Sequence, residues 1–84
     1  MYEVIFDSVA LKFLEKTEKK IAKRIWEKIL LTKENPHRFF ERLTGRKDYK
    51  LRVGEYRIIA DIDNHQKKIL ITYIDHRGKV YKRI

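Results

Sequence analysis

Residues 49–62 read Tyr49-Lys50-Leu51-Arg52-Val53-Gly54-Glu55-Tyr56-Arg57-Ile58-Ile59-Ala60-Asp61-Ile62. Apolar and basic side chains alternate before Gly54, which is the period of a strand with one buried face. Gly54-Glu55 is a tight-turn signal, and a second β-type run follows it at once. We therefore expect an antiparallel hairpin in which Arg57 lies close to Arg52, with Lys50 on the same face as Arg52.

The chain after this hairpin predicts a third strand. Residues 63–67 form a polar turn, and the nearly continuous apolar run from Lys68 to Ile74 is typical of a strand near the middle of a sheet. Val80-Tyr81 either continues the pairing or frays.

The chain before the hairpin predicts one strand and two helices. Residues 2–6 are a short β-type run, and Asp7 or Ser8 can cap a helix over residues 9–16. Thr17-Glu18 begins a second helix, whose apolar stripe recurs at three- and four-residue steps until Asn35-Pro36 ends it. Two helices joined so tightly should pack as an antiparallel hairpin. Residues 36–47 are expected to be irregular.

The element order is β-α-α-β-β-β, with the helices first and a meander of strands after them. This order predicts an α+β fold in which an N-terminal antiparallel helical hairpin packs on one face of a mainly antiparallel sheet. Eighty-four residues are enough for one domain, so we assign residues 1–84 to a single domain.

The positive charge is concentrated in one half of the chain. The net charge is +9; residues 1–41 carry nine basic and seven acidic groups, whereas residues 42–84 carry twelve and five. Such a field attracts polyanions, and RNA and an acidic protein partner would both satisfy it. There is no cysteine, and neither a signal peptide nor an apolar stretch of the roughly 18 residues that a membrane helix needs is visible. We expect a cytoplasmic protein.

Several classes of chemistry lack the residues they require. There is no Gly-rich phosphate loop, the three histidines are scattered, and no His or carboxylate pair has metal-ligand spacing. Ser8 is the only serine and is placed to cap a helix. We therefore predict no metal and no cofactor.

A basic set on adjacent strands is the remaining candidate site, and its members are Lys50, Arg52, Arg57, His76, Arg77 and Tyr81. Guanidinium and ammonium groups on one sheet face would clamp a phosphate and favour the negative charge of a phosphorane-like transition state. Tyr81 could stack on a base. If the 2′-OH of RNA is the nucleophile, no metal is required. The alternative is a solvated polar sheet face with ordinary surface charges.

Three motifs resemble the RelE/ParE superfamily of prokaryotic toxin–antitoxin toxins: Arg42-Leu43-Thr44-Gly45, the hairpin over residues 49–59, and His76-Arg77-Gly78-Lys79-Val80-Tyr81. The resemblance implies a RelE-like (microbial-RNase-like) fold. For the RelE branch it implies a ribosome-dependent, metal-independent endoribonuclease that cuts mRNA in the ribosomal A site and so inhibits translation. It also implies a cognate antitoxin that is acidic and RelB-like.

The resemblance also implies roles for individual residues. Lys50 and Arg52 would activate the 2′-OH and hold phosphate, and Arg57 would stabilise the charge of the transition state. Arg77 would assist the leaving 5′-oxygen, with His76 as an alternative general acid. The residues implied in RNA binding are Lys47, Lys50, Arg52, Arg57, Arg77, Lys79 and Tyr81.

Two other functions are compatible with the same resemblance. A ParE-like toxin shares the fold, binds DNA gyrase and cuts nothing. A catalytically inactive homologue would retain antitoxin binding alone. The set of Arg57, Arg77 and Tyr81 favours the nuclease branch.

Overall fold

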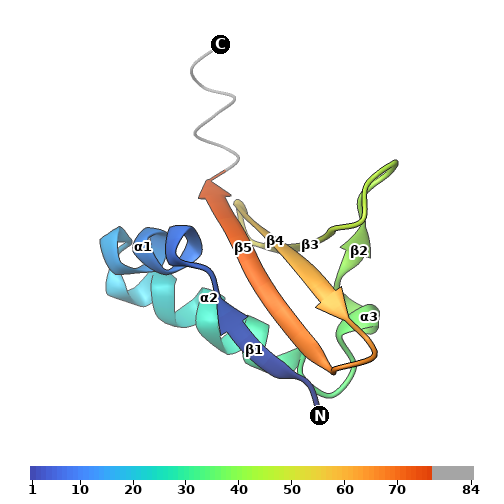
Figure 1. Ribbon diagram of the computed structural model, residues 1–84. Coiled ribbons are helices and arrows are strands. Elements are labelled where there is room, and N and C mark those ends of the chain that lie inside the picture. Colours follow the sequence, from blue (N-terminus) through green and yellow to red (C-terminus); the bar gives the residue numbers. More distant parts are fainter. Residues whose placement is uncertain (77–84) are drawn as a thin grey trace.

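The computed structural model of the protein describes residues 1–76, and Figure 1 shows how its elements are arranged. In chain order these are β1 (Glu3–Phe6), α1 (Ser8–Lys16), α2 (Lys19–Leu31), α3 (Pro36–Phe39), β2 (Glu41–Arg42), β3 (Tyr49–Val53), β4 (Tyr56–Asp63) and β5 (Lys68–His76). None of the helices within residues 1–76 has the length and apolar character needed to cross a membrane.

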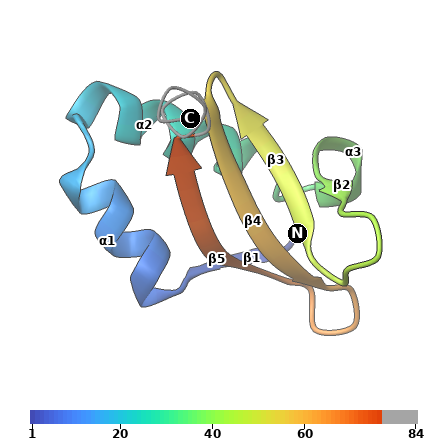
Figure 2. The ribbon, with the colours of Figure 1, turned by 90° about the horizontal axis from the view of Figure 1, so that it is seen from above.

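The five strands form one sheet in the order β1-β5-β4-β3-β2. β1 pairs with β5 in parallel, and all other neighbours are antiparallel. α1 packs against β5 and α2 against β3, and Figure 2 shows the helices beside and behind the sheet. The predicted α+β class, with helices on a mainly antiparallel sheet, is confirmed. The apolar strand after residue 67 is internal, as expected.

One core lies between the helices and the sheet. Ala10 of α1 and Ile25 and Ile29 of α2 are fully buried against inward-facing strand residues such as Ile58 and Ile71. The opposite face of the sheet, which we call the outer face, carries no helix (Figure 2). Side chains that alternate along β3 and β4 therefore divide into a core set and an outer set.

The helix starts follow local chemistry. The Asp7 carboxylate accepts a hydrogen bond from the Val9 amide at 3.2 Å, which makes Asp7 the N-cap of α1. Thr17 ends α1 and Glu18 precedes α2, so only two residues connect the two helices.

Two expectations for residues 32–47 are wrong. α2 ends at Leu31 and not at Asn35-Pro36: the amides of Thr32 and Lys33 donate to the carbonyls three residues back, at 3.0 and 3.2 Å, so the α-helical pattern stops there. Pro36 instead begins α3, since the first turn of a helix needs no amide donor from it. The segment expected to be irregular thus contains α3 and β2.

A bulge on β5 changes which side chains reach the outer face. Ile59 pairs with Tyr73 and Ala60 pairs with Ile71, so Thr72 has no partner residue on β4. In regular alternation Tyr73 would share the buried face with Ile71. The extra residue turns Tyr73 and Asp75 to the outer face and leaves Ile74 in the core.

Candidate nucleic-acid interface

The β3–β4 hairpin brings two arginines together on the outer face. Gly54 has a φ of 60°, which a glycine adopts without strain, and it forms the two-residue turn with Glu55. Arg52 and Arg57 are direct cross-strand partners as a result, and Lys50 lies opposite Ile59 on the same face. The predicted proximity of Arg52 and Arg57 is confirmed.

Carboxylates of the same chain pair with two of the three predicted cations on the outer face, Lys50 and Arg57. Nη2 of Arg57 lies 2.8 Å from Oδ2 of Asp75, and Nζ of Lys50 lies 3.5 Å from Oε1 of Glu41. Asp75 and Arg57 are cross-strand partners, as are Glu41 and Lys50. Within residues 1–76, Arg52 is exposed and forms no ion pair. The face is therefore basic but partly neutralised from within.

The Arg57–Asp75 pair is half-buried and incompletely satisfied. The side chains are 30% and 15% exposed, respectively. Nε of Arg57 and Oδ1 of Asp75 are both buried, and neither has a hydrogen-bond partner among residues 1–76. One hydrogen bond thus joins two groups that have the capacity for two. The ion pair therefore uses only part of the hydrogen-bonding capacity of both side chains.

His76 lies on the other face of the sheet. It pairs with Tyr56 across β4 and β5, and their ring centroids are 4.6 Å apart. Both residues line a hollow of about 690 Å³ on the helix side, together with Phe13. Nε2 of His76 lies 3.6 Å from Oε1 of Glu55, which is in the turn between β3 and β4. Alternation along β5 separates His76 from Arg52 and Arg57, so the structure does not bring it into their set.

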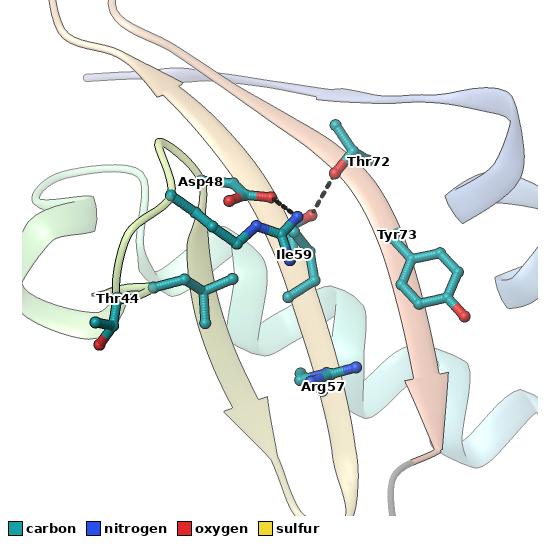
Figure 3. A pocket seen from close by; sticks show the side chains of 8 residues that line it. Thr44, Asp48, Arg57, Ile59, Thr72 and Tyr73 are labelled. Atoms are coloured by element: carbon teal, nitrogen blue, oxygen red, sulfur yellow. Dashed lines mark hydrogen bonds and ion pairs between the residues drawn. The ribbon is translucent and has the colours of Figure 1, made fainter. Parts of the chain in front are cut away.

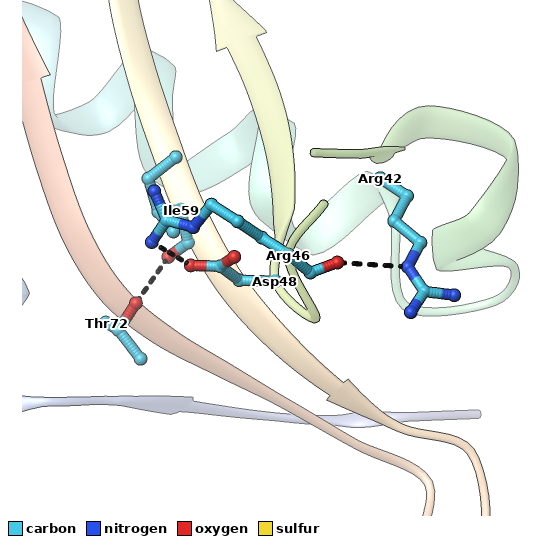
Figure 4. Close-up of polar contacts among 5 residues, drawn as sticks. All are labelled: Arg42, Arg46, Asp48, Ile59 and Thr72. Atoms are coloured by element: carbon cyan, nitrogen blue, oxygen red, sulfur yellow. Dashed lines mark hydrogen bonds and ion pairs between the residues drawn. The ribbon is translucent and has the colours of Figure 1, made fainter. Parts of the chain in front are cut away.

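The remaining predicted residues fall in two groups. Lys47 is exposed in the loop between β2 and β3, next to the pair formed by Arg46 and Asp48 at 2.6 Å. Figure 4 shows this pair above β4, with Arg42 donating from Nε to the Arg46 carbonyl at 3.2 Å. Arg77, Lys79 and Tyr81 lie outside the residues that the structure describes.

Sequence reasoning missed a depression of about 510 Å³ on the outer face. Tyr73 lines it on one side and Thr44 on the other, with Ile59 and Arg57 between them (Figure 3). A regular apolar strand from Lys68 to Ile74 does not predict Tyr73 and Asp75 on this face. The sequence signal for the bulge is the spacing of the isoleucines, which changes from two residues to three after Ile71.

No three His, Asp or Glu side chains gather where they could hold a metal ion in the part of the chain that the structure describes.

Comparisons with known proteins agree with this architecture. The chain matches the family described as ParE toxin of the type II toxin–antitoxin system parDE over residues 4–81. A comparison with curated protein sequences gives no significant match.

Similar solved structures include toxin chains of RelBE complexes. The RelBE2 complex from Mycobacterium tuberculosis gives a TM-score of 0.81 at 26% identity, with 90% of this chain and 98% of that chain covered. The RelE–RelB complex from the archaeon Pyrococcus horikoshii gives a TM-score of 0.75 at 26% identity, with 93% of this chain and 97% of that chain covered. The E. coli RelBE complex gives a TM-score of 0.76 at 20% identity, with 88% of this chain and 94% of that chain covered. At this identity the similarity concerns the fold alone. Because the family match spans nearly the whole chain, this protein belongs to the ParE toxin family of type II toxin–antitoxin systems, within the RelE/ParE superfamily.

Proposed function

We propose that the protein is an endoribonuclease that cuts mRNA in the ribosomal A site and thereby inhibits translation. It acts without a metal ion, and the outer face around Arg52 and Arg57 is its active surface. As a type II toxin it is held inactive by a cognate antitoxin, which we propose is acidic and RelB-like. The RelE–RelB complexes among the similar structures support such a partner.

The opposition of Arg52 and Arg57 is the observation that carries this proposal. Like charges directly opposite one another on a sheet are destabilising, yet here the hairpin register holds them so. Arg52 is not compensated by any carboxylate within residues 1–76. A bound phosphate between the two guanidinium groups would turn this repulsion into attraction, since guanidinium and phosphate geometries match.

The chemistry needs charge stabilisation and two proton transfers. The 2′-oxygen loses its proton and attacks the adjacent phosphorus, while the bond to the 5′-oxygen breaks and that oxygen gains a proton. The products are a 2′,3′-cyclic phosphate and a 5′-hydroxyl end. Arg52 and Arg57 stabilise the added negative charge on the phosphoryl oxygens, and Lys50 assists loss of the 2′ proton. Arg77 and Tyr81 keep their proposed roles at the leaving oxygen and the base.

Substrate binding exchanges one anion for another at Arg57. The Asp75 carboxylate holds the guanidinium in the free protein, so the incoming phosphate competes with it. This competition weakens the binding of free RNA phosphates to Arg57. It favours RNA that a second macromolecule already holds in place. We propose that the requirement for the ribosome reflects this exchange.

Cleavage of mRNA on programmed ribosomes in the presence of a metal chelator tests the proposal. We expect wild type to cut and Arg57→Ala to be slower by about 100-fold or more, the usual effect of removing one transition-state donor. Arg24→Ala is the matched control, because Arg24 is an exposed arginine on α2, away from the outer face. It should cut at the wild-type rate. Circular dichroism verifies the fold of each variant.

A folded wild-type protein that cuts nothing under these conditions contradicts the proposal. The second candidate is then binding of DNA gyrase without cleavage, which the ParE description of the matching family favours. Inhibition of gyrase supercoiling by wild type would support it. The neutralised state of the Lys50 and Arg57 side chains is compatible with a surface that only binds.

A further inference from the structure

The depression beside Arg57 has the composition of a site for a planar ring. Its floor is Ile59, which is buried although it lies on the outer face. Tyr73 stands on the β5 side of that floor, and the loop over residues 43–48 stands on the opposite side (Figure 3). The loop is tied by its own hydrogen bonds, from Leu43 N–H to the Asp48 carbonyl at 3.1 Å and from Arg46 N–H to the Leu43 carbonyl at 3.1 Å.

Tyr73 is held in position but is left open to solvent. Its side chain lies opposite Ile59 in the register, and the residue is 46% exposed. The bulge at Thr72 is stabilised where the Thr72 hydroxyl donates to the Ile59 carbonyl at 3.2 Å. The register shift therefore turns Tyr73 to the outer face, whereas regular pairing would have buried it. Bulges of this kind serve to re-aim a side chain.

The polar groups around the depression offer both donors and acceptors. Arg46 brings guanidinium donors and Asp48 a carboxylate, which pair with each other at 2.6 Å, and Thr44 adds a hydroxyl. A nucleobase needs this combination: an aromatic face to stack on, an apolar floor, and a few groups that donate to its oxygens or accept from its N–H groups. Arg57 also belongs to the cationic pair on the hairpin, so a base seated here would have its phosphate beside guanidinium groups.

We propose that Tyr73 and this depression form a subsite for one unpaired base of single-stranded RNA, with the base stacked on the Tyr73 ring and its phosphate on Arg57 and Arg52. This inference rests on the proposed function for the identity of the ligand, but it concerns binding and not the cleavage step. It is separate from the stacking role that the family resemblance implies for Tyr81.

Binding of a short 2′-O-methyl RNA separates this subsite from catalysis, because the substrate has no free 2′-OH to attack. The control ligand is the same oligonucleotide without its bases but with all of its phosphates. Tyr73→Ala should weaken binding of the complete oligonucleotide by about 5- to 100-fold, the range for loss of one base–aromatic stack. It should change the affinity for the base-free oligonucleotide by less than about 2-fold.

Three matched variants make the result specific. Tyr73→Phe keeps the ring and should bind both oligonucleotides within about 2-fold of wild type. Arg57→Ala should weaken both equally, since it contacts phosphate. Leu11→Ala truncates a residue of α1 with similar exposure, 44%, and should change neither.

Equal weakening of both oligonucleotides by Tyr73→Ala would overturn the subsite and assign Tyr73 a role in the fold. The subsite would also be overturned if Tyr73→Ala bound the complete oligonucleotide as tightly as wild type does, or if wild type did not bind it at low salt. The ribosome cleavage assay reports the proposed function separately. Base-dependent binding through Tyr73 without cleavage would keep the subsite and refute the nuclease, and cleavage without base dependence would do the reverse.

Discussion

Arg57 on β4 and Asp75 on β5 are direct cross-strand partners, and Nη2 of Arg57 donates a hydrogen bond to Oδ2 of Asp75 at 2.8 Å. The central cation of the candidate site is therefore occupied by a carboxylate of its own chain. In the proposed function, anion binding at this face is therefore an exchange and not a simple capture.

Asp75→Asn should raise the affinity for 2′-O-methyl RNA by roughly 5-fold at about 0.1 M salt, equivalent to one additional effective phosphate contact on a single strand. The same change should lower the free energy of unfolding by about 1–2 kcal/mol, because it weakens a half-buried charge-assisted bond. Fluorescence anisotropy and urea unfolding measure the two effects. Glu27→Gln, at an exposed site on α2, is the control. Unchanged or weaker RNA binding by the folded Asp75→Asn protein would contradict the exchange.

Arg52→Gln should stabilise the fold while it impairs function. It removes one of two like charges directly opposite each other, so the free energy of unfolding should rise by about 0.2–1 kcal/mol at low ionic strength. The gain should shrink with added salt, which screens exposed charges. Urea unfolding at two salt concentrations tests it. Arg24→Gln, on the helix side, should show no such gain, and a loss of stability in Arg52→Gln would count against the repulsion.

His76→Ala should affect stability more than cleavage. Its ring packs on Tyr56 at 4.6 Å on the helix side of the sheet, away from Arg52 and Arg57. The loss of this aromatic contact should cost about 0.5–1.5 kcal/mol. The rate of mRNA cleavage by the folded variant should stay within about 3-fold of wild type. A fall of 100-fold or more would restore His76 as the general acid.

Gly54→Ala should destabilise the hairpin that holds Arg52 against Arg57. The residue has a φ of 60°, and a methyl group there meets no atom within 4 Å, so the cost is backbone strain alone. We expect a loss of about 1 kcal/mol in the free energy of unfolding, with Gly54→Asn milder because asparagine tolerates this conformation. Urea unfolding of both variants decides it. Equal stability of Gly54→Ala and wild type would show that the turn relaxes.

The hairpin site was accessible to sequence reasoning, whereas its surroundings were not. Strand alternation and a two-residue turn put Arg52 opposite Arg57 through contacts between residues close in the chain. The carboxylates that pair with Arg57 and Lys50 come from β5 and β2, and their pairing depends on the order of the strands. A count of basic residues therefore overstated the free charge of the face.

Two features of the sequence allow a second interpretation. Asn35-Pro36 predicts the end of the second helix, but a proline is equally suited to begin a helix, and α3 starts there. The isoleucine spacing after Ile71 indicates a break in the period of β5.

Local chemistry alone specified the helical hairpin, the β3–β4 turn and the side of each strand that faces the core, since caps, turns and periodicity act over a few residues. The assembled sheet specified the rest. Only pairing with β4 shows that Thr72 is the extra residue, that Tyr73 and Asp75 emerge on the outer face, and that His76 does not. A one-residue shift in register moves every later side chain to the other face of a sheet. Long-range pairing therefore decided the composition of the site.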